Sequence, residues 1–368
     1  MDEFVPCRYT GNLDWLRDHT IYMTCHGSHA YGTNTESSDH DYKGIAIPPK
    51  EYIFGTKRFE QAEYKDAENN SEATVFELRK LIGLAVDCNP NIIEVLWADE
   101  SDHVLVHPLA QLLLDNKDLF LSKKARHSFS GYAASQFKRI KNHNDWLRRE
   151  SSIHEPTREE FGLHPIPKIR PDQYDAIISL IQRRVDMWNL KDMTDLTPDQ
   201  RVDVTNMLNE TLIDITASSR PDLYFAAEHY LGLDDNLIEV VQEERNYRSA
   251  CSDWNSYLKW KRERNPHRHD LEDKFGYDTK HAYHLVRLMR MCREILTLGR
   301  VIVKRPDADE LLSIRRGDWS FERIEEFFKT EDAAMDDLYK KSTLRRSPDR
   351  NVIEDLTVYI VEMSLELL

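Results

Sequence analysis

The sequence predicts an α+β fold, in which an N-terminal part mixes short strands with helices and a mainly helical part follows. Near the N-terminus, the apolar run IYMTC ends at a His-Gly pair, and DYKGIAIP alternates as a half-buried strand does until two prolines stop it. From about His107 onward, apolar residues recur at helical spacing almost throughout. We therefore expect a domain of strands and helices over residues 1–106, and an α-helical domain over residues 107–368.

The remaining elements follow from the same patterns. The segment SEATVFELRKLIGLAVDC begins as a strand and continues as an amphipathic helix until Asn89 and Pro90 break it. Later helices are clearest in PLAQLLLDNKDLF, SGYAASQFKRIKNHNDWLRR, PDQYDAIISLIQRRVDMWNL and KHAYHLVRLMRMCREILTLGR. Between the second and third of these runs, residues 151–173 carry four prolines, which predicts a loop within the helical domain.

Composition limits the classes of partner. The chain has 50 basic and 65 acidic residues and a net charge of −15, so a polyanion such as RNA would need a local basic patch. Its five cysteines include no CxxC pair, which is typical of reduced thiols. No signal peptide and no run of ~20 apolar residues is visible. We expect a cytoplasmic protein without a membrane partner.

The stretch HGSHAYGTNTESSDHDYKGIAIP holds the strongest candidate for a site. Asp39 and Asp41 are separated by one residue, so both point to one face if the segment is extended. Two carboxylates side by side repel each other unless a cation such as Mg²⁺, or Mn²⁺, lies between them. Upstream, Gly27 and Ser28 let backbone N–H groups approach an anion closely. This order of features predicts phosphoryl chemistry.

The same features resemble the active-site signature of the DNA polymerase β-like nucleotidyltransferase superfamily. More closely, GSHAYGTNTESSDHDYKGI, LRKLIGLAVDCNPNIIEVLW, FSGYAASQFKRI and RNPHRHDLEDKFGYDTKHAYHLVRL resemble blocks of the RNA-ligase-associated, polymerase β-like predicted nucleotidyltransferases. The likeness extends from about residue 26 to about residue 315, apart from a dissimilar middle at roughly 150–255. It implies that residues 1–106 form a nucleotidyltransferase catalytic domain, with a small mixed sheet and flanking helices. It also implies the catalytic class, and it leaves the acceptor open.

The resemblance implies a two-metal nucleotidyl transfer. Gly27 and Ser28 would hold the triphosphate of an NTP, and Asp39 and Asp41 would ligate both metal ions. A third carboxylate, on a neighbouring strand, would bind the catalytic metal. Where the family pattern has aspartate, this chain has Glu72, at the head of the run EATVFEL.

Two other acids compete with Glu72 for that role, Asp66 and Glu77. If EATVFEL is a strand, Glu72, Thr74 and Phe76 share a face and Glu77 points the other way. We therefore expect Glu72 to complete the catalytic and metal-binding set with Asp39 and Asp41.

The block GYDTKHAYHLVRLMR predicts a second group of binding residues. Asp278 or Thr279 can cap the helix, after which Lys280, His284 and Arg287 fall on one face as a short basic stripe. In an acidic protein such a stripe is a candidate for binding nucleotide phosphates. A solvated helix face is the competing interpretation, and the resemblance favours the functional one.

Several other residues are expected to have structural roles. His26 is expected to pack, and the aromatic residues Tyr31, Trp97 and Tyr132 to lie in the core. The pair His267 and His269 lacks partners at zinc-ligand spacing, so no zinc site is predicted there. Basic runs occur in SQFKRIKNHNDWLRR and SYLKWKRERNPHRHD, and either could be a groove for nucleic acid or an exposed face paired with acids.

The sequence thus predicts a metal-dependent nucleotidyltransferase that moves an NMP from an NTP, with ATP among the candidates, to an acceptor hydroxyl and releases pyrophosphate. The acceptor could be an RNA end, a protein side chain or a small molecule; the basic runs favour RNA. The alternative is a catalytically weak or inactive relative that serves as a nucleotide-binding or interaction module.

Overall fold

The computed structural model describes residues 13–36, 38–66, 70–149, 153–167, 235–263, 272 and 274–367. Two compact units make up the chain: Met1–Arg148 with Pro266–Leu368, and Arg149–Asn265. All the residues of the candidate site belong to the first unit. The domain boundary predicted between residues 106 and 107 does not coincide with the limits of these two units. It separates the part of the chain with strands from the helical part, and it stays a prediction.

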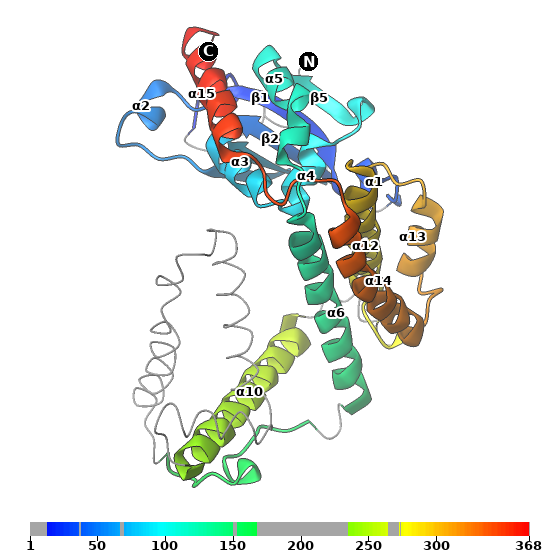
Figure 1. Cartoon of the computed structure of the whole chain (residues 1–368). Coiled ribbons are helices and arrows are strands. Elements are labelled where there is room, and N and C mark those ends of the chain that lie inside the picture. Colours follow the sequence, from blue (N-terminus) through cyan, green and yellow to red (C-terminus); the bar gives the residue numbers. More distant parts are fainter. Residues whose placement is uncertain are drawn as a thin grey trace. The chain divides into compact units, whose positions relative to one another are not determined.

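A five-stranded mixed sheet forms the centre of the N-terminal region (Figure 1). Its strands are β1 (Thr20–His26), β2 (His40–Ala46), β3 (Gln61–Asp66), β4 (Ser71–Glu77) and β5 (His103–Val106). The order is β3-β4-β2-β1-β5, in which β2 and β4 are parallel and the other neighbours are antiparallel. Together with the helices that follow, this sheet confirms the predicted α+β class.

The register of the sheet decides which side chains face the main core. Tyr22, Ile45 and Phe76 lie side by side on β1, β2 and β4, and all three are buried. Asp41 and Ile45 stand four residues apart on β2, so they share that face because side chains alternate along a strand. The opposite face holds a smaller cluster around Met23 and Val75. Asp41 of the predicted acid pair therefore lies on the side of the sheet that the main core covers.

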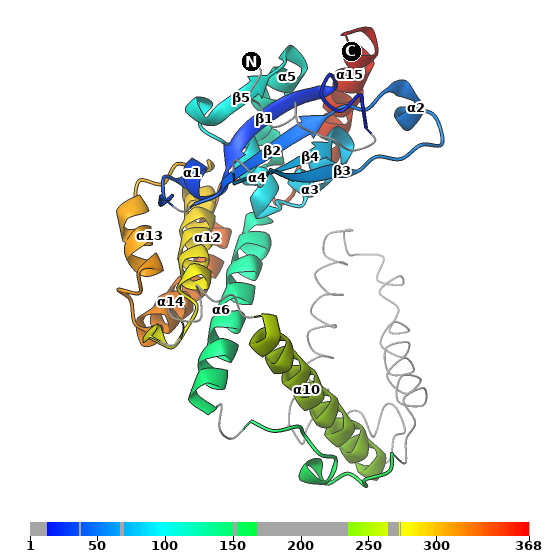
Figure 2. The same ribbon diagram turned by 180° about the vertical axis from the view of Figure 1, so that it is seen from behind.

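Helices near the sheet cover this main face (Figures 1 and 2). They are α3 (Leu78–Val86), α4 (Pro90–Leu96), α5 (Pro108–Asp115) and the C-terminal α15 (Arg350–Leu367). Apolar residues at helical spacing in α3 are buried against the same core. Short elements complete the region: α1 (Gly27–Tyr31), α2 (Lys50–Ile53) and the 3-10 turns Glu100–Asp102 and Lys117–Phe120.

The helical part of the first unit contains α6 (Ala125–Arg149), α12 (Thr279–Leu298), α13 (Ala308–Arg315) and α14 (Phe321–Lys341). Helix α12 packs against α13 and α14, and twelve of its residues are buried. Phe137 of α6 stacks on Phe328 of α14, with ring centroids 4.6 Å apart. One continuous core joins these helices to the sheet, and this core fixes α12 relative to β2.

The second unit is described over residues 153–167 and 235–263. These contain a 3-10 turn (Glu159–Phe161) and the long helix α10 (Asp235–Glu263). The guanidinium of Arg158 binds both carboxylate oxygens of Glu244, at 3.1 and 2.8 Å. Residues 153–167 are otherwise irregular, and the loop predicted over residues 151–173 stays a prediction. Its remaining residues and the predicted helix PDQYDAIISLIQRRVDMWNL lie outside the described residues. None of the helices in the described ranges has the length and hydropathy for crossing a membrane.

Candidate active site

A cavity of about 390 Å³ lies where the end of β1 and the start of β2 meet α6, α12 and α13. Asp39 and Asp41 line it together with Gly27 and Ser28. Its cationic lining side chains are Lys43, Lys280, Arg287 and Arg315. The structure thus brings all but one of the predicted site residues into one cavity.

The two aspartates are positioned by β2. Strand β2 begins at His40, so Asp39 directly precedes it and Asp41 is its second residue. Both line the cavity, in agreement with the alternation predicted from the sequence. Burial raises the pKa of Asp41 above its usual value, and the Asp39 carboxylate raises it further, while Lys43 lowers it. Charge is therefore unfavourable at Asp41, and a cation held by both carboxylates would relieve this cost.

Gly27 is required by its backbone and by its neighbour. Its φ is +68°, a left-handed conformation that side chains disfavour. A Cβ atom at this position would lie 2.3 Å from Oδ2 of Asp41. Glycine therefore lets the turn after β1 pass directly beside the Asp41 carboxylate, and Ser28 follows at the cavity wall.

His26 does more than pack. Its Nδ1 accepts a hydrogen bond from the Gly27 N–H at 2.6 Å and so caps α1. Its Nε2 lies 3.3 Å from the carbonyl oxygen of Asn91, to which it can donate a hydrogen bond. Burial is the main cause that lowers the pKa of His26 to about 3, and the positive charges of Lys43 and Arg287 contribute. The imidazole is therefore neutral at ordinary pH. The expectation of a simple packing role missed this cap.

Glu72 lies beside Asp41 but outside the cavity lining. The two residues are direct partners on the parallel strands β2 and β4, so their side chains share a face. The Glu72 carboxylate is half-exposed and pairs with Lys65 Nζ at 2.5 Å. The expected neighbouring strand is present, and the role of Glu72 as third carboxylate stays a prediction.

The two rival acids are placed less favourably. Glu77 is buried and ends β4, where its carboxylate accepts from the Lys80 N–H at 2.9 Å and from Arg79 Nε at 2.7 Å. It therefore serves as the N-cap of α3. Asp66 is paired with Ser71, one residue before Glu72, so its side chain points to the opposite face of the sheet.

Helix α12 brings the predicted phosphate-binding residues to the cavity. Asp278 caps the helix by accepting from the N–H groups of Lys280 and His281, at 2.8 and 3.1 Å. Lys280, His284 and Arg287 all line the cavity, as their spacing predicted. They do not form a uniformly basic stripe. Burial lowers the pKa of His284 well below its usual value, and the positive charges of Arg287 and Lys280 lower it further. His284 is neutral, whereas Lys280 is an exposed cation.

Arg287 is held by a buried network that the sequence did not reveal. Its guanidinium forms an ion pair with Glu94 of α4 at 2.5 Å, and both side chains are almost fully buried. The same guanidinium lies 3.9 Å above the ring of Tyr31, whose hydroxyl donates to Glu94. Burial opposes the charge on Arg287, but the Glu94 carboxylate outweighs this effect and raises the pKa of Arg287 above its usual value. The only sequence signal was an acid inside the apolar helix IIEVLW.

Two more lining residues, Lys43 and Arg315, were not identified from the sequence, and a third, Tyr132, was assigned to the wrong place. Lys43 shares the face of Asp41 two residues along β2 and donates to Thr74 Oγ1 at 2.8 Å, so strand alternation alone could have indicated it. Arg315 enters from α13 and donates to the Thr33 carbonyl at 3.3 Å; no local pattern indicates it. Tyr132 was expected in the core, but it is 41% exposed and lines the cavity.

The other two aromatic predictions are confirmed. Tyr31 and Trp97 are buried, at 3% and 8% exposure. Tyr132 differs because it lies on the side of α6 that borders the cavity, whereas Phe129, Ala133 and Ile140 of the same helix are buried in the core. The pair His267 and His269 lies outside the described residues.

An acid pair on a strand of a mixed sheet, next to a glycine turn, is the arrangement of a polymerase β-like nucleotidyltransferase. Residues 13–154 match the family RlaP, described as the RNA repair pathway DNA polymerase beta family. It is also 26% identical, over 129 residues, to an uncharacterized 38.9 kDa protein of the nrdC-mobD intergenic region of Enterobacteria phage T4. That match covers 32% of this chain and 37% of the phage protein. No solved structure matches the chain.

The contact between Gly27 and Asp41 generates a first prediction. Gly27→Ala should displace the Asp41 carboxylate, because the new methyl group would overlap it in a left-handed backbone conformation. We expect weaker Mn²⁺ binding, measured by titration calorimetry, and a lower melting temperature. Gly83→Ala is the matched control, since a Cβ at Gly83 of α3 meets nothing within 4 Å. That variant should be neutral or stabilised by up to ~1 kcal/mol, and equal behaviour of both variants would contradict the account.

The Arg287 network generates a second prediction. Glu94→Gln leaves a buried guanidinium without its counter-charge, which should lower the free energy of unfolding by about 3–5 kcal/mol. Denaturant unfolding measures the loss. Asp87→Asn is the control: it breaks the exposed 3.0 Å pair with Lys124 and should cost less than about 1 kcal/mol. A small loss in Glu94→Gln would show that the network does not hold Arg287.

Proposed function

We propose that this protein is a metal-dependent nucleotidyltransferase that moves an NMP from an NTP to an acceptor hydroxyl and releases pyrophosphate. One observation carries the proposal: Asp39, Asp41, Gly27 and Ser28 line the same cavity as the cationic residues of α12. The match of residues 13–154 to the polymerase β-like family of RNA repair supports the reaction class.

The charges of the cavity suit a nucleoside triphosphate. Four cationic side chains and two carboxylates line it, and its two histidines have lowered pKa values that keep them neutral. A triphosphate needs cations along its whole length, and carboxylates only where a divalent ion bridges to it. Asp39 and Asp41 lie at the β2 wall, while Lys280 and Arg287 come from α12. The cavity therefore offers anion-binding and metal-binding groups from separate elements.

The residues present fit a divalent ion, since Asp41 bears a raised pKa beside Asp39 and both are hard oxygen donors. Bound there, Mg²⁺ or Mn²⁺ would supply a Lewis acid for the phosphoryl oxygens. Gly27 and Ser28 would contact the triphosphate through backbone N–H and hydroxyl groups. Lys280 and Arg287 would bind its oxygens, and His284 would contribute a neutral hydrogen-bonding group. Once its carboxylate is released from the ion pair with Lys65, Glu72 would accept the proton of the attacking hydroxyl.

An RNA end is the acceptor that the surface of α6 favours. Lys138, Arg139 and Lys141 are exposed on this helix, and no ion pair within the described residues neutralises them. Arg139 is seven residues beyond Tyr132, so it lies on the side of α6 that reaches the cavity. Such a basic track beside an exposed aromatic ring suits a single-stranded nucleic-acid backbone and a stacked base. The description of the family as part of RNA repair agrees with this acceptor.

A nucleotide-binding module without strong catalysis is the second candidate. It is favoured by the ion pair that holds Glu72 against Lys65 and away from the cavity lining. The two candidates differ in one product, because an enzyme releases pyrophosphate from an NTP and a binding module does not. Measuring pyrophosphate with each NTP, Mg²⁺ and short RNA oligonucleotides decides between them.

Asp39→Asn and Asp41→Asn should each reduce transfer by several orders of magnitude, where every factor of ten corresponds to about 1.4 kcal/mol of barrier. The amide keeps the shape of the side chain and removes the charge that holds the metal. Folding should survive, and the melting temperature of Asp41→Asn without metal should equal or exceed that of the wild type, because burial opposes the charge on Asp41. Wild-type turnover of either variant in Mg²⁺ would refute the two-metal assignment.

Glu72→Gln should abolish transfer while NTP affinity, measured by calorimetry, stays nearly unchanged, because the nucleotide would be held by the other residues of the cavity. Asp66→Asn should have little effect, since Asp66 faces the opposite side of the sheet. Lys65→Ala should preserve transfer, because it only releases the Glu72 carboxylate. Full activity of Glu72→Gln would assign the third carboxylate elsewhere.

A further inference from the structure

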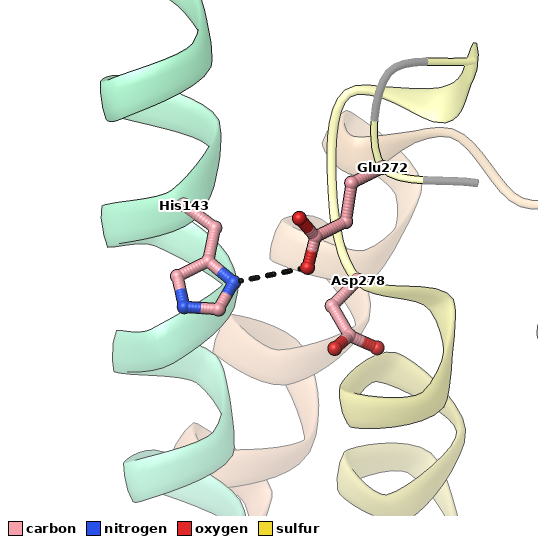
Figure 3. A group of neighbouring side chains, drawn as sticks. All are labelled: His143, Glu272 and Asp278. Carbon is pink, nitrogen blue, oxygen red and sulfur yellow. Dashed lines mark ion pairs between the residues drawn. The ribbon is translucent and has the colours of Figure 1, made fainter. Parts of the chain in front are cut away.

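A second group of potential metal ligands lies away from the two aspartates. His143 on α6 points toward Glu272 and Asp278, which lie in the segment that leads into α12 (Figure 3). One ligand atom from each of the three side chains lies within 4.8 Å of the other two. The two carboxylates are buried, at 2% and 3% exposure. None of these three residues lines the candidate active site.

The distance between His143 and Glu272 is compatible with two ligands of one bound ion. His143 Nδ1 lies 3.5 Å from Glu272 Oε1, whereas N–H···O bonds are commonly about 2.7–3.2 Å long. Around a tetrahedral zinc ion with bonds of about 2.0–2.1 Å, neighbouring ligand atoms stand roughly 3.3 Å apart. A divalent ion between the side chains would also neutralise two carboxylates that are buried close together.

Neighbouring residues give the group the support that metal ligands usually have. Oδ1 of Asp278 accepts the two N–H groups that cap α12, and the second oxygen of this carboxylate is Oδ2. This Oδ2 lies 3.5 Å from Nε2 of His281. Nδ1 of His281 lies 2.7 Å from Gln136 Oε1. If Nδ1 donates a hydrogen bond to that oxygen, Nε2 carries a lone pair that points toward the Asp278 carboxylate. A hydrogen bond of this kind commonly orients a histidine beside a metal.

We propose that His143, Glu272 and Asp278 bind a divalent transition metal ion, with zinc as the best match to one imidazole and two carboxylates. The remaining coordination position would take water or His281 Nε2. The ion would join α6 to the N-terminal end of α12, the helix that carries Lys280 and Arg287 to the cavity. This is a structural site, and it does not depend on the proposed transferase activity.

The test is zinc binding by the full-length protein after removal of metals with a chelator. Equilibrium dialysis against Zn²⁺ in excess Mg²⁺, followed by elemental analysis, should give one tightly bound zinc per chain. Zinc should also raise the melting temperature. His143→Gln and Glu272→Gln should each weaken the tight binding by roughly tenfold or more, and should lose the thermal shift.

Two controls separate this site from others. His127→Gln removes an exposed histidine from the same helix, and Asp39→Asn alters the candidate catalytic site; both should bind zinc as the wild type does. If Glu272→Gln fails to fold, His143→Gln decides, because His143 is only half-buried. Absence of tight zinc binding in the wild type, or unchanged binding in a folded His143→Gln protein, would overturn the proposal.

Discussion

The contact between Gly27 and the carboxylate of Asp41 is the constraint on which the rest of the site depends. It requires a left-handed residue without a side chain at the end of β1, and it places the turn of α1 against the acid on β2. His26 stabilises the same turn by accepting the Gly27 N–H. Because Asp41 is close to Asp39, this packing forces negative charge into a partly buried position. Such a position is costly unless it serves to bind a cation.

The buried pair between Arg287 and Glu94 joins two parts of the chain that are 193 residues apart in sequence. Glu94 lies within the segment that matches the RNA repair family, whereas Arg287 lies far beyond it. The matched segment therefore supplies the acids, the glycine turn and the lining from α4 and α6, whereas α12 and α13 supply most of the cations of the cavity. A nucleotide that contacts the two aspartates and α12 would therefore need both the matched segment and the helices α12 and α13 to be folded.

Strand alternation and family resemblance sufficed to predict the α+β class, the acid pair, the glycine turn and the face of α12 that meets them. These features are local, since each depends on residues close together in sequence. The ionisation of His284 could not be predicted, because it follows from burial beside Arg287. Glu94, Arg315 and Tyr132 were missed or misplaced for the same reason: their surroundings come from distant segments. Glu72 was correctly placed next to Asp41, but its ion pair with Lys65 required the sheet register.

The most direct test of the account is a crystal structure of the protein with a non-hydrolysable NTP analogue and Mn²⁺, whose anomalous signal locates the metal. The account predicts Mn²⁺ at ligand distance, about 2.1–2.2 Å, from carboxylate oxygens of both Asp39 and Asp41. It also predicts the triphosphate against Gly27 and Ser28, with Lys280 and Arg287 on its other side. A nucleotide bound elsewhere, or Mn²⁺ that contacts neither aspartate, would contradict it.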